Sequence, residues 1–315
     1  MSLSFQLSYL RKLASLLSLL IIVGILSILS PHFFTVENLL SVGLQMSVIA
    51  IMSIGQVWII ISGGIDLSVA SVMAISGVMT TLLITHGVDL TVASLSGILV
   101  GAGCGLVNGF LIAIGKLPPF IATLGMMGIA RGIALIITGG VAIFGLPQEF
   151  AFLANERVWG YIPIPVFITM VLATLGHIVL TRTPFGRYTY AMGSNFEATR
   201  LSGINVNRCL IQVYLLAGFL YGIAGIILAS RLSTGQPTAG TGYELDVIAA
   251  CVIGGASLSG GIGTIWGALA GSLLIGVLRN GCNLLDISAF WQQVAIGSII
   301  VVAVFIDQYQ KARKV

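Results

Sequence analysis

The residue types that usually carry catalysis or bind metals are few in this sequence, and they stand apart from one another. Its three histidines, His32, His86 and His177, have no serine, cysteine or carboxylate constellation around them. The cysteines lie in apolar sequence without the spacing of a metal site or a disulfide framework: they are Cys104, Cys209, Cys251 and Cys282. We therefore predict no catalytic residue and no metal site, and we interpret the cysteines as packing residues.

One glycine-rich stretch, GAGCGLVNG at 101–109, comes nearest to a phosphate-binding loop. It lies inside an apolar run and lacks the following Lys-Ser or Lys-Thr pair of that motif, so we predict that this chain does not bind ATP by itself. Glycines instead recur every four residues in three segments, which places them on one helix face where backbones can approach closely. They are Gly97, Gly101, Gly105 and Gly109; Gly218 and Gly222; and Gly263, Gly267 and Gly271.

The composition sets the environment of these residues. Hydrophobic residues make up 57% of the 315 residues and charged residues only 8%, with a mean hydropathy of +1.08. A soluble domain carries about 25% charged residues, so this chain could not cover a globule with a water-compatible surface. Its net charge of +4 comes without a basic cluster interleaved with aromatic residues. An ordinary soluble enzyme, a disordered protein and a nucleic-acid binder are all excluded.

Apolar runs of about 20 residues are long enough to cross a bilayer as helices. We predict an all-α, polytopic membrane helical bundle of about ten transmembrane helices in a single domain, 1–315. The expected spans are 13–30, 42–61, 67–85, 90–114, 119–138, 161–181, 210–230, 244–261, 263–279 and 290–307. We expect the first span to be retained rather than cleaved as a signal peptide, because Pro31 and the bulky pair Phe33 and Phe34 follow it.

The basic residues indicate the orientation. With the N-terminus inside, the inner segments hold Arg11, Lys12, Lys116, Arg182, Arg187, Arg200, Arg208, Lys311, Arg313 and Lys314, which are most of the 14 basic residues. The only basic residues in the outer segments are Arg157 and Arg231. This asymmetry follows the positive-inside tendency, and an odd number of spans would separate the two basic termini. We therefore expect both termini to be cytoplasmic.

Two parts of the chain resemble each other. The residues VIA (48–50), Ile54-Gly55 and SGGI (62–65) recur as VIA (247–249), Ile253-Gly254 and SGGI (259–262). In the expected topology both copies run from outside to inside and end in a Gly-Gly break. Transporters often contain such repeats, so we favour an internal repeat, with chance similarity among apolar, glycine-rich segments as the alternative.

A long polar stretch, 182–209, interrupts the apolar sequence. Ser194 and Glu197 have the spacing of a capping box, and Gly203 is a suitable left-handed helix stop. We predict a short helix from Asn195 to Ser202 between them. Because so short a helix is unstable alone in water, it indicates a docking element for a cytoplasmic partner. The alternative is a solvated connector.

Four stretches resemble the membrane permeases of ribose-type ABC importers for monosaccharides. They are SGGIDLSVAS (62–71), KLPPFIATLG (116–125), GRYTYAMGSNFEATRLSGINVNR (186–208) and RLSTGQPTAGTGYELDVIAACVIGGASLSGGIG (231–263). The resemblance implies a type II ABC importer permease fold in a bacterial inner membrane. It implies ribose or a related pentose or furanose as substrate, although related permeases carry allose, galactose, arabinose, xylose or autoinducer-2. This chain departs from the family pattern at Ile262, where relatives often carry a basic residue, and at Ser194, where they often carry glycine.

The resemblance also implies partners. Two permease chains, here expected to be identical, pair with two cytoplasmic ATP-binding subunits that hold ATP and Mg, and a periplasmic protein delivers the sugar. The family's coupling loop corresponds to Gly193, Ser194, Asn195, Glu197, Arg200, Gly203 and Asn205. Its short helix would turn closure of the ATPase subunits into displacement of spans six and seven. The longest outer segments are 139–160 and 231–243. The second is a candidate for contacting the binding protein or lining the mouth of the path, and a flexible connector is the alternative.

Several polar residues lie within or beside the expected spans, where polar groups usually face the bundle interior. The candidates for a translocation path are Gln45, Gln56, Asn108, Thr123 and Asn280. Hydrogen bonds between helices are an equally good explanation for each. For Arg131 we favour capping of neighbouring carbonyls over gating. We expect Asp66 to cap span three through the Ser68 and Val69 amides, rather than to couple transport to an ion.

Two other classes of membrane protein remain as rivals. A gradient-driven secondary transporter or channel would need intramembrane acidic or histidine relays, of which the deep span interiors contain almost none. A membrane-embedded enzyme would need convergent carboxylates, histidines or a metal cluster, and the sequence contains no such pattern.

Overall fold

The structure is a computed structural model, which describes residue 17 and residues 19–312. It is a bundle of helices with one small hairpin of two strands, in which Arg157 pairs with Pro163 and Val158 with Ile162. The elements in chain order are the helix Leu19–Leu29, α2 (Val36–Ile61), α3 (Val69–Thr85), α4 (Leu90–Ala113), α5 (Pro119–Thr138), α6 (Gln148–Asn155), β1 (Arg157–Val158), β2 (Ile162–Pro163), α7 (Ile164–Arg182), α8 (Pro184–Ser194), α9 (Phe196–Leu201), α10 (Val206–Leu232), α11 (Tyr243–Ile253), α12 (Ile265–Leu284) and α13 (Ala289–Ala312).

Six of these helices are long and apolar enough to cross a membrane: α2, α4, α5, α7, α10 and α12. Shorter apolar helices are Leu19–Leu29, α3 and the Ala289–Val302 part of α13. The prediction of a mostly helical, polytopic membrane protein is thus confirmed. Side-chain caps fix several helix starts: the Asp89 carboxylate accepts from Thr91 N and the Thr264 hydroxyl accepts from Gly267 N.

The predicted eighth span, 244–261, is wrong in its extent. Its helix, α11, ends at Ile253 after 11 residues, which is about 16 Å and half of a bilayer crossing. Gly255, Gly260 and Gly261 then adopt left-handed backbone conformations with φ of 90°, 84° and 73°. Glycine takes these angles without steric cost, so the chain forms a loop over 254–264. The prediction ended the span at the second glycine pair, Gly260-Gly261, and overlooked Gly254-Gly255, where the helix ends and where such a pair is a turn signal.

The glycine pattern produces close helix packing, as predicted, except that Gly263 lies in the loop before α12. A Cβ atom added to Gly101 on α4 would lie 2.6 Å from the carbonyl oxygen of Gly218 on α10. One added to Gly109 would lie 2.8 Å from the Cα of Ile211. Both contacts are too close for any side chain, so α4 and α10 pack backbone to backbone. The second half of α2 lies in the centre of the bundle and is buried on all sides from Met46 to Ile61.

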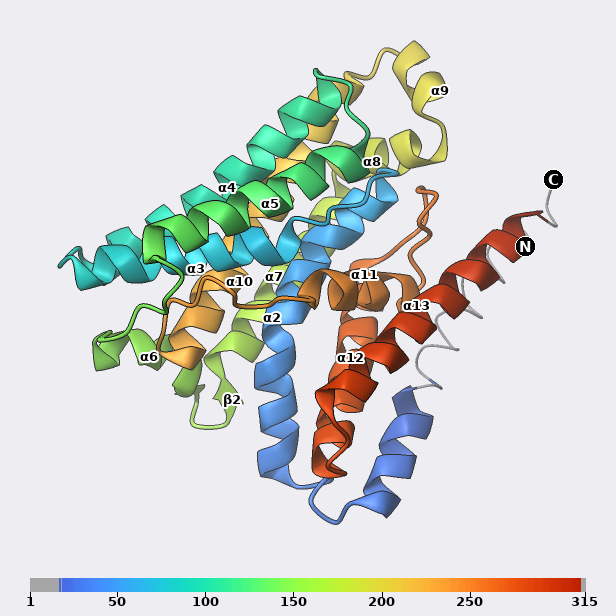
Figure 1. Ribbon diagram of the computed structural model, residues 1–315. Coiled ribbons are helices and arrows are strands. Elements are labelled where there is room, and N and C mark those ends of the chain that lie inside the picture. The colour runs from blue at the N-terminus through green and yellow to red at the C-terminus, as the bar shows by residue number, and fades with distance from the viewer. Residues whose placement is uncertain (1–16, 18, 313–315) are drawn as a thin grey trace.

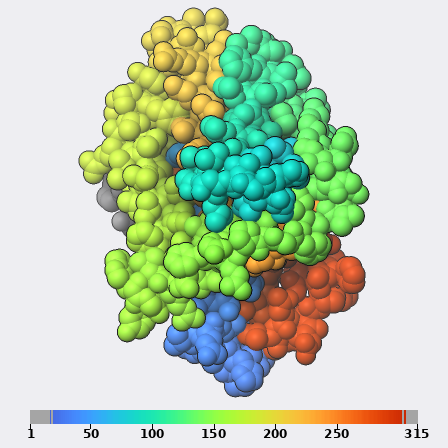
Figure 2. Space-filling model, turned by 90° about the vertical axis from the view of Figure 1, so that its left-hand side faces the viewer, coloured from blue at the N-terminus to red at the C-terminus, as the bar shows by residue number. Residues whose placement is uncertain are grey.

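The bundle has two distinct ends. The polar segment with α8 and α9 lies at one end, and the start of α2 with the β1–β2 hairpin lies at the other (Figure 1). The space-filling view shows the same separation, with the segment around residue 200 at the top and the N-terminal part of α2 at the bottom (Figure 2). This places the candidate docking element far from the β1–β2 hairpin and the start of α2.

Candidate functional site

The polar segment contains two helices rather than the one that was predicted. The unpredicted helix is α8, where the Thr183 hydroxyl accepts from Gly186 N at 3.4 Å and Pro184 occupies the first helical position. A Thr-Pro pair of this kind is a helix-start signal, and it could have identified α8 from the sequence. Together α8 and α9 form a compact elbow bent at Asn195, which projects from the end of the bundle (Figure 1).

The predicted capping box is wrong. Asn195 caps α9, because its Oδ1 atom accepts a hydrogen bond from Ala198 N at 2.9 Å, whereas Ser194 is the last residue of α8. Glu197 does not reach back to the helix start and instead forms an ion pair with Arg200, at 2.8 Å. Asn195 takes over as the cap because its backbone is extended, with φ −158° and ψ 101°, and asparagine caps as well as serine does.

The end of the segment agrees with the prediction. Gly203 has the left-handed φ of 83° that was expected of the helix stop, although α9 spans six residues, Phe196–Leu201, and not eight. Asn205 caps the next helix by accepting from Arg208 N at 3.0 Å. The helix α9 is therefore fixed at its start by the Asn195 cap and at its end by the left-handed Gly203.

The outer surface of α9 carries both apolar and charged groups. Leu201 is 78% exposed, and the Glu197 and Arg200 side chains are 64% and 58% exposed. On the opposite side Thr199 is buried and donates to the Asn195 carbonyl oxygen at 2.8 Å. An exposed leucine beside a charged pair is suited to a protein partner, since it combines apolar area with a polar rim.

Three of the singled-out polar residues meet at the start of α3. The Asp66 Oδ1 atom accepts from Ser68 N at 2.7 Å and from the Ser68 hydroxyl at 2.6 Å. Asn108 on α4 donates to the Ser68 hydroxyl oxygen at 3.1 Å, and the Thr123 hydroxyl lies 3.2 Å from both Ile65 O and Leu67 N. All of these side chains are fully buried. They tie α4 and α5 to the break between α2 and α3.

As predicted, the Asp66 carboxylate accepts from the Ser68 amide. Among the described residues it does not accept from the Val69 amide, so the predicted cap is formed in part. Asp66 lies in the break between two helices, where burial raises the pKa of its carboxyl group to about 6. The two hydrogen bonds from Ser68 lower this pKa, but desolvation has the larger effect.

The other path candidates are spread along the bundle. Gln56 on α2 is buried and accepts from the Tyr221 hydroxyl on α10 at 3.0 Å. Asn280 on α12 and Asn38 on α2 exchange two amide hydrogen bonds of 2.9 and 2.7 Å. Gln45 is exposed. Gln56 and Asn280 thus form hydrogen bonds between helices, as the alternative interpretation expects. The role of all five candidates in a translocation path stays a prediction.

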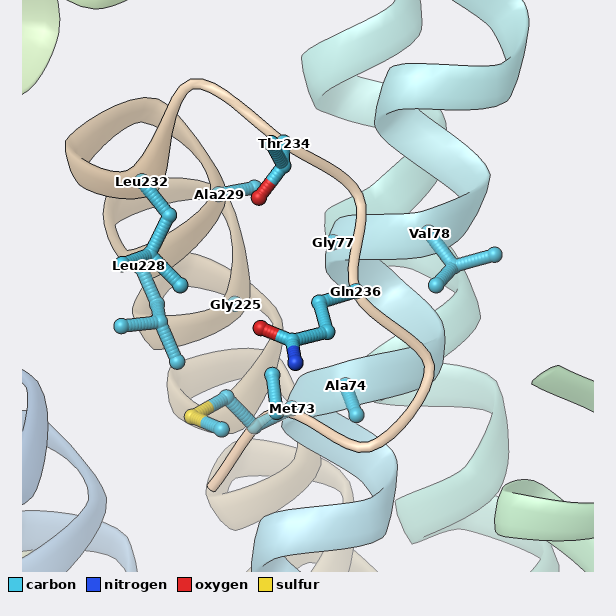
Figure 3. Close-up of a pocket in the computed structure, with 11 residues that line it drawn as sticks. Met73, Ala74, Gly77, Val78, Gly225, Leu228, Ala229, Leu232, Thr234 and Gln236 are labelled. Carbon is cyan, nitrogen blue, oxygen red and sulfur yellow. The ribbon is translucent and has the colours of Figure 1, made fainter. Parts of the chain in front are cut away.

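Arg131 has the carbonyl partners that were expected of it. Its Nη1 atom donates to the carbonyl oxygens of Pro237 and Ala239, at 2.6 and 3.0 Å. These carbonyls belong to the segment 233–242, which leaves α10 and returns into the bundle beside α3 (Figure 3). The Gln236 side chain points between α3 and α10 there (Figure 3), and the small, partly open pocket that it lines has a volume of about 10 Å³. We call 233–242 the re-entrant loop.

The depth of this loop follows from its two anchors. Gly235 forms a bridge with Ile143, beyond the end of α5, whereas Arg131 lies seven residues before that end, about 10 Å further into the bundle. The long arginine side chain supplies hydrogen-bond donors to carbonyl groups of this non-helical backbone.

The sequence interpretation missed an ion pair inside the bundle. Arg279 on α12 donates to both carboxylate oxygens of Asp246 on α11, at 2.9 and 2.7 Å, and Asp246 is buried. The residues are 33 positions apart, so no local spacing pairs them. The pair could have been predicted from energetics, because a charged arginine within a span needs an acidic or carbonyl partner to offset its cost.

Comparison with known proteins identifies the type of membrane protein. The family of branched-chain amino acid transport system permease components matches residues 38–304. The chain belongs to this permease family. The permease is 43% identical to the ribose import permease of Escherichia coli (strain K12) over 96% of this chain and 95% of that protein. It is 46% identical to the ribose import permease of Bacillus subtilis (strain 168), over 96% and 94%.

The similarity extends to permeases named for another pentose. The L-arabinose transport system permease of Escherichia coli (strain K12) is 43% identical over 91% of this chain and 88% of its own length. No solved structure matches the permease. The chain is thus the membrane component of an ABC transporter and is not itself the ATPase.

Proposed function

We propose that this permease carries ribose, or a related pentose or furanose, into the cell as the membrane subunit of an ATP-driven importer. The observation that carries the proposal is nearly full-length similarity to proteins named as ribose and arabinose permeases. The two groups of relatives match at almost the same identity. The similarity therefore favours a pentose over the alternatives allose, galactose and autoinducer-2.

The proposed topology has ten membrane-embedded segments with both termini in the cytoplasm. Nine are the six long and three shorter apolar helices, and the tenth is α11 with its flanking loops. The basic residues around α8 and α9 and at the C-terminus support this orientation. It places α9 in the cytoplasm and the re-entrant loop at the outer mouth, in a bacterial inner membrane.

In this proposal α9 docks in a groove of a cytoplasmic ATPase subunit, which supplies ATP and Mg. Its exposed Leu201 and the Glu197–Arg200 pair form the contact surface. Two identical permease chains pair across the sugar path, and a periplasmic binding protein delivers the sugar to the outer mouth. ATP-driven closure of the ATPase pair then moves α9 and opens the path to alternate sides.

Reconstitution tests the proposal. The permease is purified with its co-purifying ATPase, placed in vesicles that enclose ATP and Mg, and supplied from outside with binding protein and labelled ribose, arabinose or galactose. We expect uptake of a pentose that depends on ATP and on the binding protein. Uptake that follows an imposed proton or sodium gradient without ATP would establish the secondary-transporter alternative instead. Preferential uptake of galactose would refute the pentose assignment alone.

A further inference from the structure

The C-terminal end of α8 lies where three backbone segments meet. A Cβ atom added to Gly193 would collide with the carbonyl oxygen of Ile61 at the end of α2, and it would lie 2.5 Å from Gly261 N. One added to Gly260 would lie 2.6 Å from the Gly193 carbonyl oxygen and 3.0 Å from the Gly63 Cα. No side chain fits between these segments. The end of α8 is therefore in backbone contact with the two Gly-Gly breaks, Gly63-Gly64 and Gly260-Gly261.

Two hydrogen bonds connect the same segments. Gly261 N donates to the Ile61 carbonyl oxygen at 2.9 Å, which joins the two breaks directly. The Tyr190 hydroxyl on α8 donates to the Gly263 carbonyl oxygen at 2.7 Å. Burial raises the pKa of the Tyr190 phenol to about 12, so this group stays protonated and keeps its donor. Steric contact and hydrogen bonding thus both hold α8 to the loop 259–263.

That loop is the turn of a rigid hairpin formed by α11 and α12. Gly267 on α12 contacts the Gly254 carbonyl oxygen, and Gly271 contacts the Ala250 carbonyl oxygen, each too closely for a side chain. At the far end of α11 the ion pair of Asp246 and Arg279 closes the hairpin. Helices packed this closely slide or tilt as a unit rather than deform.

The far end of the hairpin leads into the outer part of the bundle. The start of α11 continues directly into the re-entrant loop, whose Pro237 and Ala239 carbonyls accept from Arg131. Figure 1 shows this path, from α10 through the loop to α11 beside the middle of α2. A continuous series of close contacts therefore runs from the elbow of α8 and α9, through the α11–α12 hairpin, to the re-entrant loop.

We propose that the glycine contact at Gly193, together with the Tyr190 hydrogen bond, is the joint that transmits movement of α8 and α9 to the α11–α12 hairpin. Tyr190 and Gly193 are positioning residues: they determine how far the hairpin and the re-entrant loop move when α9 moves. The hairpin, and not only α7 and α10 on either side of the polar segment, then changes access to the sugar path. The inference rests on the proposed function, because it assigns the internal route of the same ATP-driven movement.

The test separates docking from transmission. Tyr190→Phe removes one hydroxyl without adding bulk, and Gly193→Ala adds one methyl group at the joint. The matched controls are Tyr188→Phe, an exposed tyrosine on the same helix, and Gly103→Ala, at a glycine with open space around its Cα. For each variant we would measure the ATPase that co-purifies, the rate of ATP hydrolysis and the number of sugar molecules imported per ATP hydrolysed.

We expect Tyr190→Phe to bind the ATPase normally and to import about fivefold fewer sugar molecules per ATP, the factor that corresponds to loss of about 1 kcal/mol. Gly193→Ala should have a larger effect, and both controls should match the wild type. A role in folding alone would lower the amount of permease and leave the import per ATP unchanged.

If Tyr190→Phe imports as many sugar molecules per ATP as the wild type, the proposal that this contact transmits movement is refuted, even if Gly193→Ala fails to fold. If the wild-type permease neither binds an ATPase nor needs ATP, the proposed function itself fails, and that result comes from the unmodified chain. The two failures are therefore distinguishable.

Discussion

Substitution of Asn195 is the sharpest test of α9 as a docking element. Its side chain makes the single cap at the start of a six-residue helix, through the 2.9 Å bond from Ala198 N. Replacing a capping asparagine with alanine costs about 0.5–2 kcal/mol. A helix of this length has little stability of its own, so the loss passes almost fully into the free energy of docking. We expect Asn195→Ala to weaken ATPase binding by about 2- to 30-fold.

The neighbouring ion pair provides the comparison. Glu197 and Arg200 are both more than half exposed, and exposed pairs contribute about 0–1 kcal/mol before screening by salt. Glu197→Ala should therefore weaken binding by less than Asn195→Ala does. The capping-box interpretation predicts the reverse order, because it assigns the cap to Ser194 and Glu197 and gives Asn195 no capping role.

The assay is titration of the purified ATPase subunit against permease in nanodiscs, at matched permease concentration. Ser202→Ala is the control, because it removes an exposed hydroxyl that bonds only within the helix end, to the Ala198 carbonyl oxygen. Unchanged affinity in Asn195→Ala, or a larger loss in Glu197→Ala, would refute the reasoning that the structure of α9 determines docking.

Three further outcomes are expected. Gly101→Val should prevent close packing of α4 on α10 and lower the yield of folded permease severalfold, measured by size-exclusion chromatography in detergent, whereas Gly103→Ala should not; equal yields would contradict the backbone packing of these helices. Arg131→Ala should free the re-entrant loop, so that a cysteine placed at Gln236 reacts faster with a water-soluble maleimide than it does with Arg131 intact. Cysteines placed at the exposed residues Glu149 and Glu197 should be labelled from opposite sides of the membrane, and labelling of both from one side would invalidate the topology.

Hydropathy and glycine spacing were sufficient for much of the fold. The four-residue glycine period gave the face on which α4 meets α10, because steric exclusion depends only on which residues lack a side chain. The extent of α11 was not predicted, because the sequence contains two glycine pairs, Gly254-Gly255 and Gly260-Gly261, and the prediction ended the span at the second. Helix ends inside a membrane depend on backbone angles, which hydropathy does not report.

The candidate site shows the same division between local and long-range information. The left-handed Gly203 and the position of the short helix were local features and were predicted. The choice between Ser194 and Asn195 as the cap was not predicted, because α8 extends through Ser194 and α8 itself was overlooked. The pairing of Asp246 with Arg279 and the contact of Gly193 with Ile61 and Gly261 join residues far apart in the chain. Only the folded chain brings them together.

The short α11 also determines how this chain can be synthesised into a membrane. An 11-residue helix is too short to remain across a bilayer when it leaves the insertion machinery alone. Arg279 lies near the end of α12 and needs a partner when that helix enters the membrane. The ion pair with Asp246 gives this arginine its partner once both helices have been synthesised. We therefore expect α11 to reach its final place only after α12 has followed it through residue 279.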